Sequence, residues 1–151
     1  MTTQFFTLAM VDEELGYPPR TFASAIRNRP FPPAARIGQR AVYSQQQVDW
    51  LRKREKVGKG LRETLPFLWR TPWDNLNQQA VYMTLGDIAR ALDLYETRVR
   101  QMLHKSPLEP DAVAGHYQGY LPRSVAQWLG RHHQGLLTPH VLGKINRFPQ
   151  G

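Results

Sequence analysis

Cationic and hydroxyl side chains recur in one short stretch near the start of the chain, around two large apolar residues, Phe22 and Ile26. The stretch carries Arg20, Thr21, Ser24 and Arg27. If it is helical, Phe22 and Ile26 share the buried face, because residues four apart lie above one another. The other four residues then point away from the core. An arginine can donate two parallel hydrogen bonds to guanine, and a hydroxyl can reach a base or a phosphate. These residues predict a surface that can contact a nucleic acid.

A second polar cluster surrounds Gly38. Residues 35–43 predict two short strands, and a two-residue turn that begins with glycine is typical of a hairpin. Around that turn lie Arg36, Gln39 and Arg40. Side chains of this kind at the tip of a hairpin are suited to contact phosphates, whose negative charges attract arginine.

The second half of the chain offers a comparable helix surface with a different hairpin. On a predicted helix over residues 96–105, the outward positions are Thr97, Arg98, Gln101, His104 and Lys105, with Arg100 at the edge. Glu96 opposes phosphate, although a glutamate can accept a hydrogen bond from cytosine. In place of Arg36 and Arg40, the second hairpin offers Glu109, Asp111, His116 and Gln118. We expect this helix to contact DNA; the alternative is a copy kept for dimerisation or partner docking.

Residues for catalysis or metal binding do not cluster in this sequence. Cysteine is absent, which excludes disulfides, cysteine-based zinc sites and thiol catalysis. The histidines lack the i, i+4 spacing of a helical metal site with a carboxylate base, and no phosphate-binding loop or serine-nucleophile motif occurs. The carboxylates do not gather as a two-metal nuclease would need. We therefore expect no enzymatic activity, no metal and no cofactor.

The overall charge favours a polyanionic partner. The 151 residues include 20 Lys and Arg against 12 Asp and Glu, a formal net charge of +8, and the isoelectric point is about 10.2. DNA or RNA is the first candidate for such a partner, and an anionic membrane surface is the second. The start of the chain lacks a signal-peptide pattern, and no segment is apolar enough to span a bilayer. We expect a cytoplasmic, nucleoid-associated protein without a membrane partner.

The pattern that positions these residues occurs twice, at a constant offset of 77 residues. The matched positions are Thr7, Leu8, Val11, Leu15, Phe22, Ile26, Pro30, Tyr43 and Val48, and Thr84, Leu85, Ile88, Leu92, Val99, Leu103, Pro107, Tyr120 and Val125. A slip of one residue then aligns Trp50-Leu51 with Trp128-Leu129. Most of these residues are apolar, so the repeat is one of core positions and predicts two similar modules.

Each copy predicts a helix, a tight turn, a second helix, a hairpin and a closing helix. The predicted helices cover residues 8–15, 19–28 and 45–55, and then 85–92, 96–105 and 122–132. Thr7, Thr84 and Ser44 are suited to cap helices, Gly16 to end the first one, and Pro19 to begin the second, where its missing N–H is not needed. We expect the second hairpin, at residues 113–120, to be looser than the first.

The repeat divides the chain into a first module (1–55), a connector (56–81), a second module (82–133) and a C-terminal tail (134–151). The connector is too apolar for a free linker, so we expect it to be partly helical and packed against a module. Its Trp69 and Trp73 pack between the modules or contact a partner. The tail has no repeat partner and is a loose arm or an interaction segment. The aromatic residues expected in the core are Trp50, Trp128, Tyr43 and Tyr120.

The residue order of the first copy is that of a winged helix-turn-helix. The motifs are Thr7-x3-Val11-x3-Leu15-Gly16, Arg20-Thr21-Phe22-x3-Ile26, Phe31-Pro32-Pro33, Arg36-x-Gly38-x-Arg40, Tyr43-Ser44 and Val48-x-Trp50-Leu51. With these motifs, residues 7–54 resemble the small excisionase and phage-regulator (AlpA-like) proteins related to the DNA-binding domain of MerR-type regulators. Residues 84–131 resemble that family in their first two helices and depart from it in the hairpin.

The resemblance implies a mainly α fold with short β-hairpin wings, built as tandem winged helix-turn-helix (MerR-like) modules that bind double-stranded DNA without catalysis. It implies that the second helix enters the major groove and that the wing follows the backbone or the minor groove. Two tethered recognition helices can read two half-sites or direct repeats, because tethering raises the local concentration of the second module. A homodimer or a cooperative assembly on DNA stays open.

Several roles in a bacterium or mobile element agree with these features. One is a transcriptional regulator, and another is an excisionase or directionality factor that bends DNA for a recombinase. An accessory protein of plasmid replication or partition would share the same features. The competing class is a phage or plasmid adaptor or inhibitor that binds protein through one or both modules, and the second hairpin with its acidic residues is its best support.

Overall fold

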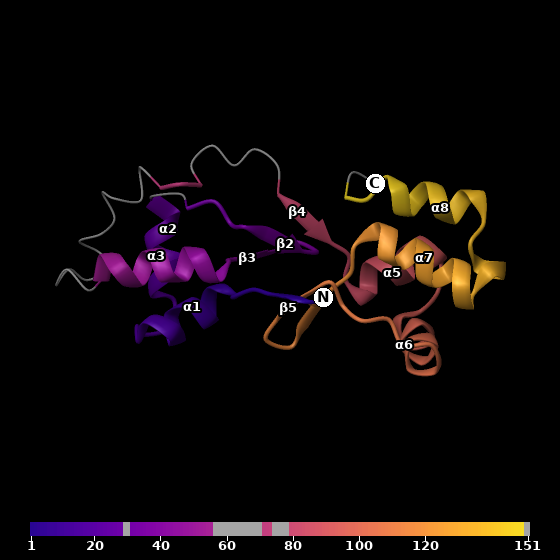
Figure 1. Ribbon diagram of the computed structural model, residues 1–151, viewed down its shortest axis with the longest axis horizontal. Helices are drawn as coiled ribbons and strands as arrows, with labels where there is room; N and C mark the ends of the chain where they lie inside the picture. Colours follow the sequence, from indigo (N-terminus) through magenta and orange to yellow (C-terminus); the bar gives the residue numbers. More distant parts are fainter. Residues whose placement is uncertain (29–30, 56–70, 74–78, 150–151) are drawn as a thin grey trace. The chain divides into compact units, whose positions relative to one another are not determined.

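The chain forms two units, each of which combines helices with short strands. The computed structural model describes residues 1–28, 31–55, 71–73 and 79–149 (Figure 1). The N-terminal module is Gln4–Ala80, and the C-terminal module is Met1–Thr3 together with Val81–Gly151. Most of the expected connector, residues 56–70 and 74–78, lies outside the described residues.

The N-terminal module has the expected order of elements. The helices are α1 (Leu8–Leu15), α2 (Thr21–Asn28) and α3 (Gln45–Glu55). Between α2 and α3, β2 (Ala35–Ile37) runs antiparallel to β3 (Arg40–Val42), with Ala35 opposite Val42 and Ile37 opposite Arg40. Strand β4 (Ala80–Tyr82), which starts at the last residue of the module, completes a sheet in the order β3-β2-β4.

Local hydrogen bonds explain where the helices of this module begin and end. The Thr7 hydroxyl accepts a hydrogen bond from the Met10 N–H at 3.2 Å, and Gly16 closes α1 in the left-handed region, with φ of 75°. At the start of α3, the Ser44 hydroxyl accepts from the Gln47 N–H while the Gln47 side-chain oxygen accepts from the Ser44 N–H, at 3.2 and 3.0 Å. Both N-caps and the stop at Gly16 are confirmed.

The predicted start of the second helix at Pro19 is wrong. Helix α2 begins at Thr21, and Pro19 and Arg20 lie in the preceding turn. Arg20 has φ of 70°, a left-handed conformation that cannot belong to a right-handed helix. The sequence signal failed because a proline is equally suited to a tight turn.

Aromatic side chains dominate the core of the N-terminal module. Phe22 meets Tyr43 edge to face with ring centroids 5.0 Å apart, and Phe31 lies edge-on to both at 5.9 and 6.0 Å. Trp50 is half-buried and packs edge-on to Phe31, whereas Trp73 stacks on Phe31 at 5.6 Å. The core position of Tyr43 is thus confirmed, whereas Trp50 is only partly buried and packs against this core. Trp73 of the expected connector also packs against it. Trp69 lies outside the described residues.

The C-terminal module repeats this arrangement and adds to it. Its elements are α5 (Leu85–Leu92), α6 (Glu96–Lys105), β5 (Ala112–Ala114), β6 (Tyr117–Gly119), α7 (Pro122–His132), the 3-10 turn η2 (Gln134–Leu136) and α8 (Pro139–Asn146). With β1 (Thr3–Gln4), the hairpin forms a sheet in the order β1-β5-β6. The second hairpin is as regular as the first, which corrects the expectation of a looser one.

The structural repeat keeps the offset of 77 residues in the hairpins and the closing helices. Helices α3 and α7 correspond at both ends, and the two hairpin turns share a positive φ at Gly38 and Gly115. This corrects the slip of one residue inferred at the tryptophans. Trp128 takes the buried place of Leu51, whereas the position of Trp50 is held by the exposed Gln127. Trp128 and Tyr120 are buried, as predicted.

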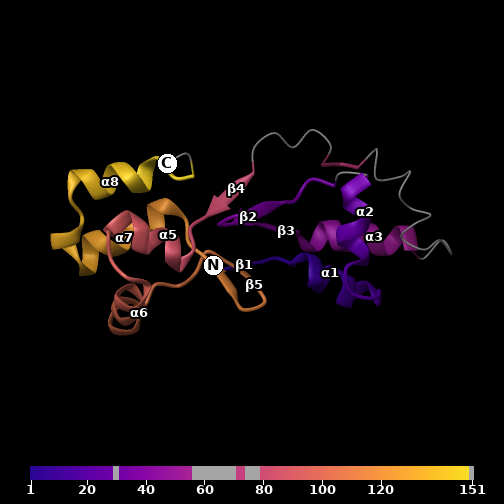
Figure 2. The same cartoon turned by 180° about the vertical axis from the view of Figure 1, so that it is seen from behind.

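The segment after the repeat is part of the C-terminal module. Helix α8 packs on α5 and α7 (Figures 1 and 2). Its Ile145 is 0% exposed in the core, and the Lys144 ammonium lies 3.2 Å from Oδ2 of Asp93. Residues 134–149 are therefore not a loose arm. The sequence analysis did not predict this helix, because it has no counterpart in the first copy of the repeat.

Candidate nucleic-acid interface

Helix α2 separates an apolar inner face from a polar outer one. Phe22 and Ala25 are buried, whereas Ser24 and Arg27 are exposed. The sequence of α2, TFASAIRN, contains a cation in its last turn and no carboxylate. An anion that approaches this face therefore meets hydroxyl and guanidinium donors without a repelling charge.

Two of the residues predicted for this face lie in the turn or support it. The Thr21 hydroxyl donates to the Pro18 carbonyl oxygen at 2.7 Å, so its proton is engaged in the turn. Arg20 is exposed and precedes the helix, in a turn where its backbone is left-handed. Ser24 and Arg27 are left as the donors on the helix itself, and Arg20 stands beside its N-terminal end.

The first hairpin displays all three of its predicted contact residues. Arg36, Gln39 and Arg40 are exposed at or beside the turn. The Arg36 guanidinium donates to the Gln39 carbonyl oxygen at 3.2 Å, which holds it across the turn. Burial raises the pKa of Tyr43 to about 12, and the charge of Arg36 acts against this rise. The hairpin therefore presents cationic side chains beside a buried, neutral phenol.

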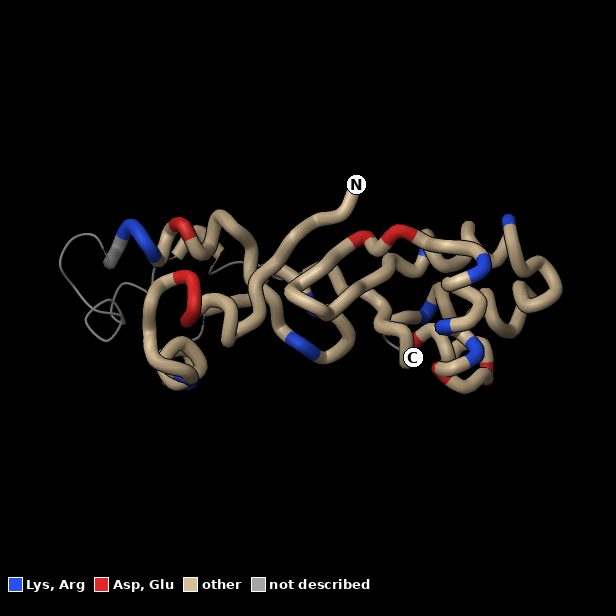
Figure 3. Tube along the Cα trace, turned by 90° about the horizontal axis from the view of Figure 1, so that it is seen from below, with Lys and Arg blue, Asp and Glu red and all other residues tan. Residues whose placement is uncertain are grey.

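Helix α6 exposes the full set of residues predicted for the second half. Val99 and Met102 are buried in the core. The exposed positions are Glu96, Thr97, Arg98, Arg100, Gln101, His104 and Lys105. Three of these are permanent cations, so this face is basic, and Figure 3 marks cationic positions along both modules.

The carboxylate of Glu96 is directed toward the start of α5. A Cβ placed on Gly86 would lie 2.9 Å from Oε1 of Glu96, so the glycine leaves the space that this carboxylate occupies. Gly86 stands in the first turn of α5, so the Glu96 carboxylate lies against the N-terminal end of that helix.

The second hairpin carries aromatic groups at its tip, and its nearby carboxylates serve the fold. At the offset of 77, Val113 and Tyr117 replace Arg36 and Arg40. The ring of Tyr117 lies 4.2 Å from that of His116, centroid to centroid.

The two acidic residues lie before the strands of this hairpin, away from the turn. Oδ2 of Asp111 accepts from the Leu121 N–H at 2.8 Å, just before α7, and Oε1 of Glu109 accepts from the Thr2 hydroxyl at 3.0 Å. The assignment of Glu109 and Asp111 to this hairpin is therefore wrong, whereas the loss of the two arginines of the first hairpin stands. Two carboxylates that sequence position assigned to the wing are used elsewhere in the module.

The charge of Arg98 on α6 affects the pKa of His133, the residue that follows α7. The pKa of His133 is lowered by burial first, and then by the charges of His132 and Arg98. The His133 ring meets Trp128 edge to face at 4.9 Å, and its Nε2 has no hydrogen-bond partner among the described residues. Arg131 and His132 are exposed in the last turn of α7 and add to the basic residues of this module. Neither was among the contact residues predicted from the sequence.

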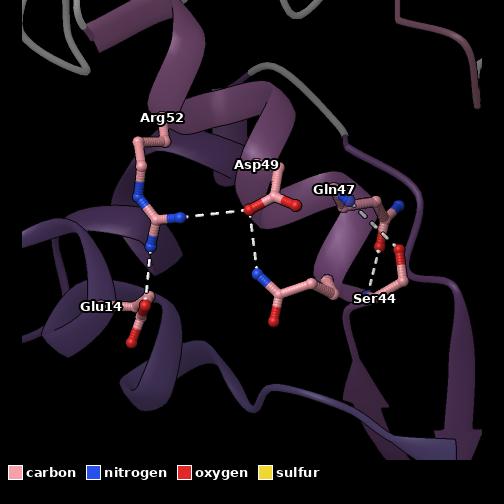
Figure 4. Close-up of polar contacts among 6 residues, drawn as sticks. Glu14, Ser44, Gln47, Asp49 and Arg52 are labelled. Carbon is pink, nitrogen blue, oxygen red and sulfur yellow. Dashed lines mark hydrogen bonds and ion pairs between the residues drawn. The ribbon is translucent and has the colours of Figure 1, made fainter.

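Arg52 shows that a basic residue of this chain can be purely structural. Its guanidinium pairs with Glu14 of α1 at 2.7 Å and with Asp49 of α3 at 3.1 Å (Figure 4). The two carboxylates neutralise it and hold α3 against α1. Arg52 is therefore a matched control for the arginines that face outward.

The chain matches no protein-family model, no curated protein and no solved structure. Within the described ranges, no group of three histidine and carboxylate residues is arranged to hold a metal ion. No helix in that part of the chain is long and apolar enough to cross a membrane.

Proposed function

We propose that this chain is a sequence-specific, double-stranded DNA-binding protein built from two tandem MerR-like winged helix-turn-helix modules. One observation carries the proposal. In each module, the second helix buries its apolar face and turns a cationic and polar face outward, with Ser24 and Arg27 on α2 and Arg98, Gln101 and Lys105 on α6. The resemblance of residues 7–54 to the excisionase and phage-regulator family supports the same conclusion.

In the proposed mechanism, α2 and α6 enter the major groove, while Arg36 and Arg40 contact phosphates beside α2. Arginine and lysine recognise guanine, and Gln101 can recognise adenine with two hydrogen bonds. The cationic contacts release counterions from DNA, so binding weakens steeply as salt rises. Tethering raises the local concentration of the second module, and a head-to-tail repeat favours directly repeated DNA elements.

The proposed cellular role follows from this chemistry. A nucleoid-associated protein that occupies repeated elements can regulate transcription, or it can bend DNA for a recombinase as an excisionase or directionality factor. Selection of bound duplexes from a random pool distinguishes one site from two and gives their spacing and orientation. A homodimer or cooperative assembly would appear as a palindrome or as a longer array in the selected sequences.

The decisive experiment compares three arginine variants. Arg27→Ala and Arg40→Ala should each weaken binding to a selected duplex, since each removes a cation from the proposed contact surface. Arg52→Ala should leave binding almost unchanged, because Glu14 and Asp49 already neutralise that residue. Binding should also fall as salt is raised from 50 to 200 mM. If no duplex binds at low salt, or if the three variants behave alike, the proposal fails.

The competing function is a protein-binding adaptor or inhibitor of a phage or plasmid. The observation that favours it is the tip of the second hairpin, where His116 and Tyr117 stand at the turn and the arginines of the first hairpin are replaced. Aromatic residues are enriched in the centres of protein interfaces. Replacement of His116 and Tyr117 by serine should leave DNA binding intact if this hairpin binds protein, and should weaken it if the hairpin contacts DNA.

A further inference from the structure

Tyr95 is the most exposed large apolar side chain within the described part of the chain, apart from Met1 at its end. Its side chain is 87% exposed, whereas that of Leu142, the next in exposure, is 37% exposed. Because the ring is exposed, it does not contribute to the hydrophobic core of the module. Packing in the core therefore does not explain why a tyrosine occupies this position.

Capping of the helix does not provide that reason. Tyr95 is the N-cap of α6, a position where Ser, Thr, Asp and Asn are preferred because their oxygen accepts a helix N–H. Within the described residues, the Tyr95 side chain makes no capping hydrogen bond to the first turn of α6. By contrast, α1, α5 and α8 begin with the capping residues Thr7, Thr84 and Thr138. At Tyr95 the chain lacks this stabilisation.

The turn that presents Tyr95 is held firmly in place. Asp93 ends α5 in the left-handed region, with φ of 54°, and the Leu94 N–H donates to the Ala89 carbonyl oxygen at 3.0 Å. The Asp93 carboxylate accepts from Lys144 of α8 at 3.2 Å. The ring therefore projects from an ordered turn, which lowers the entropic cost of a contact.

This presentation is specific to the C-terminal module. At the offset of 77, Pro18 stands where Tyr95 is, and Arg98 corresponds to Thr21, the first residue of α2. Helix α6 starts two residues before that position, at Glu96. Helix α6 is thus extended at its N-terminal end, and the Tyr95 ring stands just before it. This is the end that a recognition helix places against base edges.

We propose that Tyr95 reads bases for the C-terminal module, and that its ring contacts the C5-methyl group of thymine in the major groove. This inference rests on the proposed DNA-binding function. The charge of the neighbouring surface favours DNA as the occupant, because the exposed face of α6 that follows the ring carries Arg98, Arg100 and Lys105. Among the bases, only thymine offers a methyl group in the major groove, and apolar side chains recognise it.

The test replaces thymine by uracil, one position at a time, in the duplex that the wild-type full-length chain selects from a random pool. At one or two positions, loss of the methyl group should weaken wild-type binding about fourfold, as expected for one buried methyl group. Tyr95→Ala should bind the thymine duplex more weakly and should show no difference between thymine and uracil at those positions. Tyr95→Phe should keep the difference, and Leu142→Ala, at another exposed large apolar residue, should behave as wild type.

A stability measurement separates recognition from folding. Tyr95→Ser supplies the missing N-cap, so it should raise the melting temperature while it weakens DNA binding. The proposal is overturned if Tyr95→Ala keeps the thymine preference, or if it binds as wild type. It is also overturned if the variant changes only self-association in sedimentation, which would assign the ring to a contact between two copies. Failure of the wild-type chain to select any duplex would overturn the proposed function itself.

Discussion

Oδ1 of Asp12 accepts a hydrogen bond from the backbone N–H of Phe22 at 2.8 Å. The carboxylate lies on α1 and is 3% exposed, and the N–H belongs to the first turn of α2, where helix N–H groups lack partners within the helix. This bond sets how the second helix leaves the turn in the N-terminal module. At the offset of 77, the C-terminal module has Ala89, so there the two helices are held without it.

Removal of the Asp12 carboxylate should destabilise the N-terminal module. Asp12→Ala leaves the buried Phe22 N–H without a partner, and we expect a loss of about 1–3 kcal/mol in the free energy of unfolding. Urea unfolding followed by circular dichroism, together with faster exchange of the Phe22 amide hydrogen, measures the effect. Asp12→Asn keeps an acceptor oxygen and should lose less. If Asp12→Ala is as stable as a variant of the exposed neighbour, Glu13→Ala, the bond does not hold α2.

The indole of Trp128 should contribute through its hydrogen bond as well as its area. Its Nε1 donates to the Ser106 carbonyl oxygen at 2.7 Å, at the end of α6. Trp128→Phe keeps an aromatic ring but leaves that carbonyl without its donor, so we expect a loss of about 1–3 kcal/mol, in addition to the smaller packed area. The variant for comparison is Trp50→Phe in the other module, where the ring is half-buried and stands at a different position of the repeat. Equal thermal stability of the two variants would contradict the prediction.

Two arginines introduced into the second hairpin should give it the phosphate contacts proposed for the first hairpin. Val113→Arg combined with Tyr117→Arg places guanidinium groups where the first hairpin has Arg36 and Arg40. If the hairpins contact DNA, binding to random duplex should tighten, and each new phosphate contact should steepen the dependence of log K on log salt by about 0.9. Fluorescence anisotropy over a salt series measures the slope. The control pair, Val113→Gln with Tyr117→Gln, should leave the slope as it is; an unchanged slope in the arginine pair would place this hairpin away from DNA.

The stability of the C-terminal module should depend on pH through His133. The pKa of its imidazole is lowered in the folded chain, chiefly by burial, from the ordinary value of 6.5. As the pH falls, the unfolded chain therefore takes up the proton on His133 before the folded chain does. The contribution of the neutral imidazole to stability is fully present above pH 6.5, and it is lost as the pH falls through the lowered pKa of the folded chain. His133→Phe should reduce this loss while it keeps an aromatic ring against Trp128. Melting temperatures between pH 5 and 8 test this, with His104→Gln, at an exposed histidine that does not affect the pKa of His133, as the control. An identical pH dependence in wild type and His133→Phe would exclude this role.

The residues differ in how far their places could be predicted. The second helix of each copy was recognisable because the spacing of Phe22 and Val99 relative to their apolar neighbours repeats that of a helix, and both are 0% exposed. The outward positions followed from the same spacing. Arg52 resembles those arginines in sequence, yet one of its two partners, Glu14, belongs to a helix 38 residues away in the chain, so only the fold reveals that it is structural.

The order of the elements, the caps at Thr7, Ser44 and Thr84 and the duplicated core could be predicted from the sequence, because each depends on neighbours within a few residues or on a repeated apolar spacing. The polar groups that form contacts inside the modules became known only from the fold. It placed Asp111 at the start of α7, directed Glu96 toward α5, packed α8 on the second core and exposed Tyr95. These outcomes depend on contacts between residues far apart in sequence, whose free energies no local pattern records.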